Sequence, residues 1–433
     1  MKPTLTHFYC AAALVVIFGQ FLALGANSSL LAITFSEITL LAVGICLSGE
    51  KKPGMDRHYL AATAPLLLLA ASSIWVLIPV FTPNSRPVDV VPDALILELV
   101  KLAAVSSMVM LGAQIGRTPQ GLRSAVFWLL CAGLAYLMLS LWLWRDNPSE
   151  VWGQVKGRHV NRFTATLLNA NAAACVCATV TLLGLAQFHA SLARDRMLRT
   201  SEDWAEAGVA GLAILLGVFT IFLTASRAAG VTLAGLALVQ ALAAAGGRGR
   251  VRAQRILALL TLGGVAIAGA LALGGALTLD RPFTSEDSEV RMAGYRIYWT
   301  LLQDQPWFGY GLGAFRQLHQ SHIGPGEADL IWDLGAAHQP ILQAAMEGGI
   351  PFALGLVAAI SWLALGVLRS LLRPAPGQEL ALGVALSAVL ILAVSQIDIA
   401  LNVPAVASLA MLLLGLCWGW SVEVSKARGT ARA

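Results

Sequence analysis

Long apolar runs alternate with short polar breaks along the chain, and each run has the length of a membrane-crossing helix. A helix needs about 20 apolar residues to cross the hydrocarbon core of a bilayer. Twelve runs of this kind are predicted in the 433 residues, at roughly 8–25, 29–47, 59–80, 92–115, 124–144, 165–188, 207–225, 228–245, 256–279, 350–368, 379–398 and 403–420. The predicted fold class is therefore all-α, a polytopic membrane protein with about 12 transmembrane helices.

One long polar interval breaks this pattern, at residues 280–349. It divides the chain into residues 1–279 with the first nine helices, the loop itself, and residues 350–433 with the last three helices and a tail. Within the loop, Pro340 suits the first turn of a helix, and apolar residues then recur at helical spacing up to Gly348. The loop is therefore predicted to be partly helical.

The composition supports a membrane protein and excludes a soluble enzyme of this length. Hydrophobic residues make up 57% of the chain, charged residues 12%, and the mean hydropathy is +0.73. The basic clusters at Lys51, Arg194, 248–255 and Lys426 fall on one side of the predicted topology. Because basic loops stay in the cytoplasm, both termini are predicted to be cytoplasmic and the loop 280–349 to lie outside. The net charge of +5 follows from this bias, so no nucleic acid partner is expected.

Neither a disulfide framework nor a metal site is expected. All cysteines fall inside predicted spans. His319 and His322 have the spacing of two ligands on a helix face, but no fixed third ligand accompanies them. The glycine-rich run 309–313 is not expected to bind a nucleotide, because no strand precedes it and no Lys-Ser or Lys-Thr pair follows.

His338 is the candidate general base. Pro340 places it at a helix N-terminus, where the positive end of the helix dipole disfavours the imidazolium form. A neutral imidazole at this position can accept a proton. The carboxylate of Asp398, near the end of a span, could orient this ring or neutralise an arginine, and both possibilities remain open.

Basic residues on the outer side are candidates for holding an anion. The loop 145–162 carries Lys156, Arg158 and Arg162, either for an anionic head group or with acidic lipid as counter-ion. Asn169 and Asn171 follow at the mouth of a span, where an amide can cap a helix or contact a sugar.

Three more cations are candidates, two in or beside the spans and one in the outer loop. Arg227 falls between two spans with almost no room for a loop, so it is expected at the membrane boundary. Lys101 either pairs with Glu98 one helical turn away or holds an anionic ligand. Arg291 and Tyr295 are one turn apart and share a helix face.

These segments, in this order, resemble the O-antigen ligase and polymerase superfamily of bacterial envelope glycosyltransferases. The family pattern has an Asn-bearing motif, a Ser-Arg-Gly-like motif, Arg-x-x-x-Trp running into Pro-x-x-Gly-x-Gly-x-Gly-x-Phe, and His-Asn-x-x-Leu-x-x-x-x-Glu-x-Gly. The chain has, in turn, Asn169 to Asn171, Ser226-Arg227-Ala228, Arg291 to Tyr295 with Pro306 to Phe315, and His338 to Leu342 with Glu347 and Gly349. Tyr295 stands for the usual Trp, Gln339 for Asn and Ala228 for Gly, and none of these departures removes a charge.

The resemblance implies a GT-C-like architecture in the bacterial inner membrane, with the site facing the periplasm. The implied reaction transfers an O-antigen glycan from undecaprenyl diphosphate to a hydroxyl of the lipid A-core oligosaccharide, with inversion and without metal or other cofactor. His338, Arg291 and Arg227 would be catalytic. The residues expected to bind the diphosphate or the glycan are Arg162, Arg158, Lys101, Asn171, Tyr295 and Gln339.

Three alternatives remain open. An O-antigen polymerase would use the same donor with a glycan acceptor, and a protein O-oligosaccharyltransferase of the same superfamily would accept a Ser or Thr hydroxyl. A transporter or flippase would spread its intramembrane charges along a central path. The charges here gather at the outer mouth, which favours chemistry at the surface.

Overall fold

The computed structural model describes residues 3–48, 57–81, 92–193, 200–244, 286–324, 331–332, 334–372 and 374–430. Within these ranges, eleven helices are long and apolar enough to cross a membrane. They are α1 (Pro3–Leu22), α2 (Ser29–Ser48), α3 (Arg57–Phe81), α4 (Pro92–Gly116), α5 (Pro119–Asp146), α6 (Ala170–Ala193), α7 (Ser201–Thr224), α8 (Arg227–Ala244), α13 (Pro340–Leu371), α14 (Gln378–Ser395) and α15 (Pro404–Thr430). The all-α polytopic prediction is confirmed, and the remaining predicted span, 256–279, lies outside the described residues.

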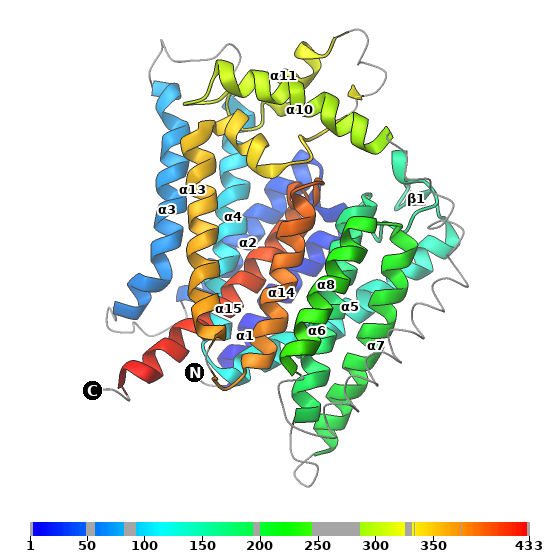
Figure 1. Ribbon diagram of the computed structural model, residues 1–433, viewed down its shortest axis with the longest axis vertical. Helices are drawn as coiled ribbons and strands as arrows, with labels where there is room; N and C mark the ends of the chain where they lie inside the picture. The colour runs from blue at the N-terminus through cyan, green and yellow to red at the C-terminus, as the bar shows by residue number, and fades with distance from the viewer. Residues whose placement is uncertain are drawn as a thin grey trace.

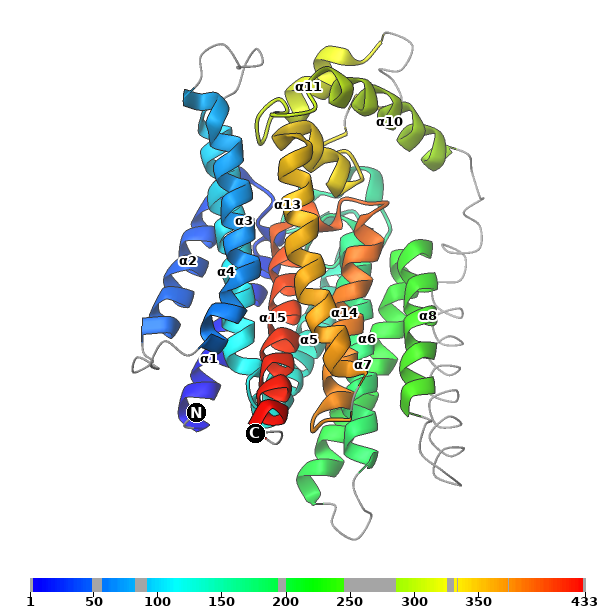
Figure 2. The ribbon, with the colours of Figure 1, turned by 60° about the vertical axis from the view of Figure 1, so that its left-hand side comes forward.

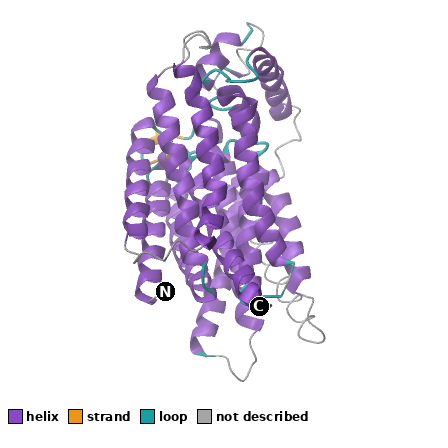
Figure 3. Ribbon diagram, turned by 90° about the vertical axis from the view of Figure 1, so that its left-hand side faces the viewer, coloured by secondary structure: helices purple, strands orange, loops and turns teal. Residues whose placement is uncertain are grey.

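Shorter elements connect these helices at one end of the bundle. Helices α10 (Glu286–Asp304) and α11 (Phe315–His322) lie across that end, away from both termini (Figures 1 and 2). The other short elements are β1 (Glu150–Val151), β2 (Gln154–Val155) and the 3-10 turns η1 (Leu24–Ala26), η3 (Gly157–His159) and η5 (Ala400–Asn402). The two strands pair antiparallel, and the rest of the described chain is helix or loop (Figure 3).

Helices α6 and α15 form the centre of the bundle. The α6 span is 94% buried and the α15 span 89% buried, whereas no other described span is more than 56% buried. Helix α6 packs against α7 and α14, and α15 packs against α4. Alanines dominate the start of α6, so its neighbours can approach closely.

Glycines bring α4 and α15 into direct backbone contact. A Cβ added to Gly112 or Gly116 of α4 would lie 2.4 or 2.1 Å from a carbonyl oxygen of α15. A Cβ added to Gly415 or Gly419 of α15 would lie 2.3 or 2.1 Å from a carbonyl oxygen of α4. Both helices therefore present glycines four residues apart at the contact, which is how membrane helices pack most closely.

Helix α13 is broken at Gly349. This residue has φ 81° and ψ 164°, a conformation open essentially only to glycine. A Cβ there would lie 1.9 Å from the carbonyl oxygen of Trp307. The break separates a short helix that begins at Pro340 from the membrane-spanning part that follows Ile350. The sequence predicted both the proline start and the end of the first segment at the glycines.

The glycine-rich run before α11 packs on this break. Backbone N–H groups of Tyr310 and Gly311 donate to the carbonyl oxygens of Met346 and Glu347, at 2.9 and 2.8 Å. On the other side, the indole of Trp75 in α3 donates to the carbonyl of Trp307 at 2.9 Å and stacks on Phe308. The run thus serves as a docking turn between α13 and α3.

Candidate active site

The side chain of Arg162 contacts both the outer loop and the bundle. Its Nε donates to the carbonyl oxygen of Thr224 at 2.8 Å, and one terminal nitrogen lies 3.2 Å from Nδ1 of His159. The other terminal nitrogen donates to Oδ1 of Asn171 at 3.4 Å. The side chain is buried, so its position is fixed by protein groups and not by solvent.

Asn169 and Asn171 make different hydrogen bonds at the start of α6. Oδ1 of Asn169 accepts from the backbone N–H groups of Asn171 and Ala172, at 2.9 and 2.8 Å, which is helix capping. Nδ2 of Asn171 donates to the carboxylate of Asp398 at 2.5 Å. The carboxylate can only accept, so it turns the Asn171 amide with its oxygen towards Arg162. Asp398 is thereby connected to Arg162 through the Asn171 amide, which favours its predicted role toward an arginine.

The turn between α7 and α8 carries the carbonyl that Arg162 contacts. Helix α7 ends at Thr224, Ala225 adopts the left-handed conformation with φ 51°, and α8 begins at Arg227. The predicted absence of a loop is confirmed. Arg162 is thereby tied to a point three residues before Arg227, so the two arginines belong to the same end of the bundle.

His338 stands immediately before α13. Its Nδ1 lies 3.0 Å from the carbonyl oxygen of Ala336. A carbonyl only accepts, so Nδ1 carries the proton in the neutral ring, and Nε2 is the nitrogen able to take up another. Tyr295 of α10 donates its hydroxyl hydrogen to the backbone oxygen of His338 at 3.3 Å. Tyr295 and His338, each predicted from the sequence as a site residue, are therefore in contact.

Gln339 is the N-cap of α13, and its side chain accepts a hydrogen bond from the N–H of Leu342. Its amide nitrogen also donates to Gln396 across 3.5 Å. Gln343, one turn into the helix, accepts from Asn402 at 3.1 Å and from the backbone of Ala337 at 3.2 Å.

The link between α14 and α15 joins the two parts of the site. Gln396 contacts the His338 side through Gln339, while Asp398, two residues later, contacts the Arg162 side through Asn171. Asn402 adds a further contact to α13. Gln343, Gln396 and Asn402 were missed by the sequence reasoning as site residues; their only signal was an amide next to the end of an apolar run.

Positive backbone φ angles concentrate in these same segments. Outside glycine, such angles are uncommon and persist only where the surroundings fix them, often at functional sites. In the loops of the site they occur at Trp152, Asn161, Ala165, Leu168, Ala225 and His338. One of these residues is His338, the candidate base itself, and another is Ala225, two residues before the candidate cation Arg227.

For Lys101, the described contact lies outside this network. Lys101 forms an ion pair with Glu98 at 2.6 Å, so the pairing interpretation holds for it. The side chains of Arg158 and Arg291 lie outside the described residues, although Arg291 falls within α10.

His319 is a packed histidine. Its ring is fully buried, and its two nitrogens contact the hydroxyl of Tyr298 at 3.1 Å and the carbonyl oxygen of Ile331 at 2.7 Å. Burial, with the nearby Tyr295 as a smaller cause, raises the pKa of Tyr298, so this hydroxyl stays protonated. His319 therefore anchors α11 to α10.

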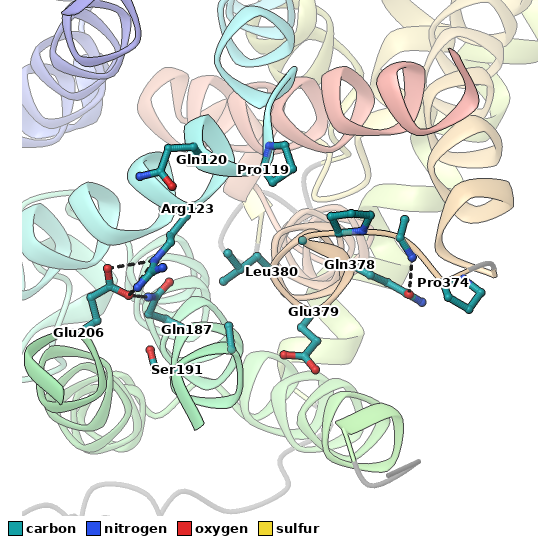
Figure 4. A pocket seen from close by; sticks show the side chains of 14 residues that line it. Pro119, Gln120, Arg123, Gln187, Ser191, Glu206, Pro374, Gln378, Glu379 and Leu380 are labelled. Carbon is teal, nitrogen blue, oxygen red and sulfur yellow. Dashed lines mark hydrogen bonds and ion pairs between the residues drawn. The ribbon is translucent and has the colours of Figure 1, made fainter. Parts of the chain in front are cut away.

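A separate cavity of about 690 Å³ lies at the opposite end of the bundle (Figure 4). There the Arg123 guanidinium contacts Asp203 at 2.8 Å and Glu206 at 2.6 Å, and Gln187 donates to Glu206. This cluster ties α5, α6 and α7 together. It shares no residue with the network around Arg162 and His338.

Fold and site together define a multi-pass helical membrane protein with an arginine, a histidine and several amides gathered at one end. Residues 212–357 match the family model described as O-antigen ligase. Proteins of this family are glycosyltransferase-like enzymes of glycan processing. No curated protein matches the chain.

The match confirms the resemblance, and the matched residues include some of the site residues but not all of them. It runs from α7 into the membrane-spanning part of α13 and includes Arg227, Arg291, Tyr295, His338 and Gln339. Arg162, Asn171 and Asp398 lie outside it. Their connection to the family segment rests on the contacts described above.

Proposed function

We propose that the protein is an O-antigen ligase. It transfers an O-antigen glycan from undecaprenyl diphosphate to a hydroxyl of the lipid A-core oligosaccharide at the periplasmic face of the inner membrane. Transfer requires no metal and inverts the anomeric carbon. The observation that carries the proposal is the link between α14 and α15. It contacts Asn171 on the Arg162 side and Gln339 on the His338 side, and His338 lies within residues 212–357, which match the O-antigen ligase model.

The first chemical requirement is a base for the acceptor. The attacking hydroxyl loses a proton as it forms the new bond to the anomeric carbon, and Nε2 of His338 takes up that proton. The fixed proton on Nδ1, held at the Ala336 carbonyl, keeps the ring in the correct tautomer.

The second requirement is stabilisation of the leaving group. The bond between the anomeric carbon and the diphosphate oxygen breaks, and undecaprenyl diphosphate leaves with both electrons of that bond. Arginine suits this task because its planar guanidinium contacts phosphate oxygens in pairs and stays charged. Arg227, Arg291 and Arg162 supply the charge, with Arg158, Asn171, Tyr295 and Gln339 contributing to binding of the diphosphate or glycan.

The orientation follows from the distribution of basic residues. The ends of α4, α6 and α13 carry the basic loops expected in the cytoplasm, and both termini lie at that same end (Figure 1). The site at the other end then faces the periplasm, where lipid-linked glycan and lipid A-core both reside.

The test is transfer by the purified protein in the presence of EDTA. Lipid-linked O-antigen is supplied with lipid A-core, and products are resolved as a ladder. The wild type is expected to modify lipid A-core, His338→Ala to lose transfer by at least about 10²-fold, and His322→Ala, an exposed histidine of α11, to retain it. Retained transfer in His338→Ala would exclude this residue as the base.

The choice of acceptor separates the related activities. Growth of the glycan on its own lipid carrier, without modification of lipid A-core, would identify a polymerase. Transfer to a Ser or Thr hydroxyl of a protein would identify an O-oligosaccharyltransferase. A strict requirement for added divalent ions would contradict the metal-free reaction.

A further inference from the structure

Lys156 is a buried lysine in the outer loop. It follows strand β2 and is only 3% exposed, although lysines are almost never buried without a partner. Its backbone is fixed on both sides, because its N–H donates to Ser149 at 3.0 Å and its carbonyl accepts from His159 at 3.0 Å. The hairpin therefore directs this side chain inward.

The Lys156 ammonium meets the backbone of Arg162. Its Nζ donates to the carbonyl oxygen of Arg162 at 3.3 Å, and no carboxylate lies within ion-pairing distance among the described residues. A buried charge without a counter-ion destabilises a fold. Burial lowers the pKa of Lys156 to about 8, which agrees with that penalty.

The position of the contact shows what the charge does. The carbonyl of Arg162 and the N–H of Phe163 belong to the same peptide group. The N–H of Phe163 donates to the carbonyl oxygen of Leu223 at 3.0 Å. The Arg162 side chain contacts Thr224 in the same turn. Lys156 thus holds the outer side of a peptide whose inner side is bound to the end of α7.

We propose that Lys156 is a positioning residue: its ammonium holds the Arg162 backbone so that the guanidinium stays at the turn before Arg227, ready for the diphosphate of the donor. The proposal rests on the proposed function. Lys156 itself does not contact the substrate, so a substitution of Lys156 changes the rate of transfer only through Arg162.

The experiment is a double-mutant cycle on the full-length protein. Lys156→Met, Arg162→Ala and the double variant are compared for kcat/KM toward the lipid-linked donor. Lys156→Met is expected to lower kcat/KM by about 10-fold through KM for the donor, with KM for the acceptor unchanged. Lys156→Gln, which keeps an N–H donor, is expected to recover part of the loss.

Non-additivity decides the role. If Lys156 acts through Arg162, the double variant is no slower than Arg162→Ala alone. If the two losses multiply, Lys156 acts on the substrate directly and the proposal is overturned. Wild-type kinetics in Lys156→Met would overturn it as well.

Two further measurements separate positioning from a structural role. Arg145→Met removes an exposed cation from the start of the same loop and is expected to leave kcat/KM unchanged. The thermal midpoint of Lys156→Met is expected to equal or exceed that of the wild type, because a buried charge is removed. A lowered midpoint with a proportional loss of folded protein would make Lys156 structural. Absence of transfer in the wild type itself would instead contradict the proposed function.

Discussion

Replacing Gly349 by Ala should dislodge the segment that carries His338. Gly349 combines a backbone conformation reserved for glycine with direct contact to another backbone. An alanine Cβ would lie 1.9 Å from the Trp307 carbonyl oxygen and 2.9 Å from the nitrogen of Phe308. Neither atom is the end of a flexible side chain, so the chain itself must move.

The size of the effect follows from two contributions. A non-glycine residue forced into this conformation is destabilised by about 1–3 kcal/mol, and overpacking against a fixed neighbour adds about 1–3 kcal/mol. The smaller entropy of an unfolded alanine offsets about 0.4–1 kcal/mol. The net loss is about 3 kcal/mol, and a shift of about 1 Å at His338 would lower activity by up to about 10²-fold.

The measurement is thermal unfolding in detergent, followed by intrinsic tryptophan fluorescence, together with transfer activity. Gly349→Ala is expected to lower the midpoint by several degrees. Gly235→Ala is the matched control, since a Cβ on this α8 glycine meets nothing within 4 Å. Its midpoint should stay the same or rise slightly. Equal midpoints and activities for both variants would refute the argument that the Trp307 contact shapes the break in α13.

Other substitutions test the rest of the site and the bundle. Arg162→Lys keeps the charge but cannot contact Thr224, Asn171 and a diphosphate together, so kcat/KM should fall by about 10- to 100-fold. Asn171→Asp places a second carboxylate beside Asp398 and draws Arg162 into an ion pair; transfer should be lost, and Asp398→Asn in the same chain should restore part of it. Arg123→Leu leaves the carboxylates of Asp203 and Glu206 without their arginine. The free energy of unfolding should fall by about 2 kcal/mol, a value between those typical of exposed and buried ion pairs, and KM for the donor should not change. The pKa of Lys156 is about 8 in the folded protein and 10.5 in the unfolded chain, so between pH 8 and 10.5 the unfolded chain binds more protons than the folded protein. Wild-type stability relative to Lys156→Met should therefore rise from pH 8 to 10.5, as chemical denaturation at several pH values would measure.

The sequence predicts the helices well because the bilayer imposes one simple rule. Eleven of the twelve predicted spans match helices in the described part of the chain, including the start of α13 at Pro340 and its break at the glycines. Local signals carry these features: apolar length, a proline that fits only a first turn, and a glycine where no side chain fits.

The contacts of the site could not be predicted in the same way. Asn171 and Asp398 are far apart in sequence, as are Gln339 and Gln396, and nothing local indicates which amide meets which carboxylate. For Lys101 the local signal left two possibilities, and the ion pair with Glu98 is the one formed. The carbonyl that receives Arg162 has no sequence signal, because every residue offers one.

The deep burial of α15 bears on how the protein is made. This helix leaves the ribosome after the other described helices, yet its glycines fit against those of α4, which is synthesised some 300 residues earlier. The matching surface of α4 therefore stays exposed to lipid and to other helices until α15 has been synthesised. A messenger truncated before Pro404 would produce a chain with most of its spans and no means of closing the bundle, a ready substrate for membrane quality-control proteases.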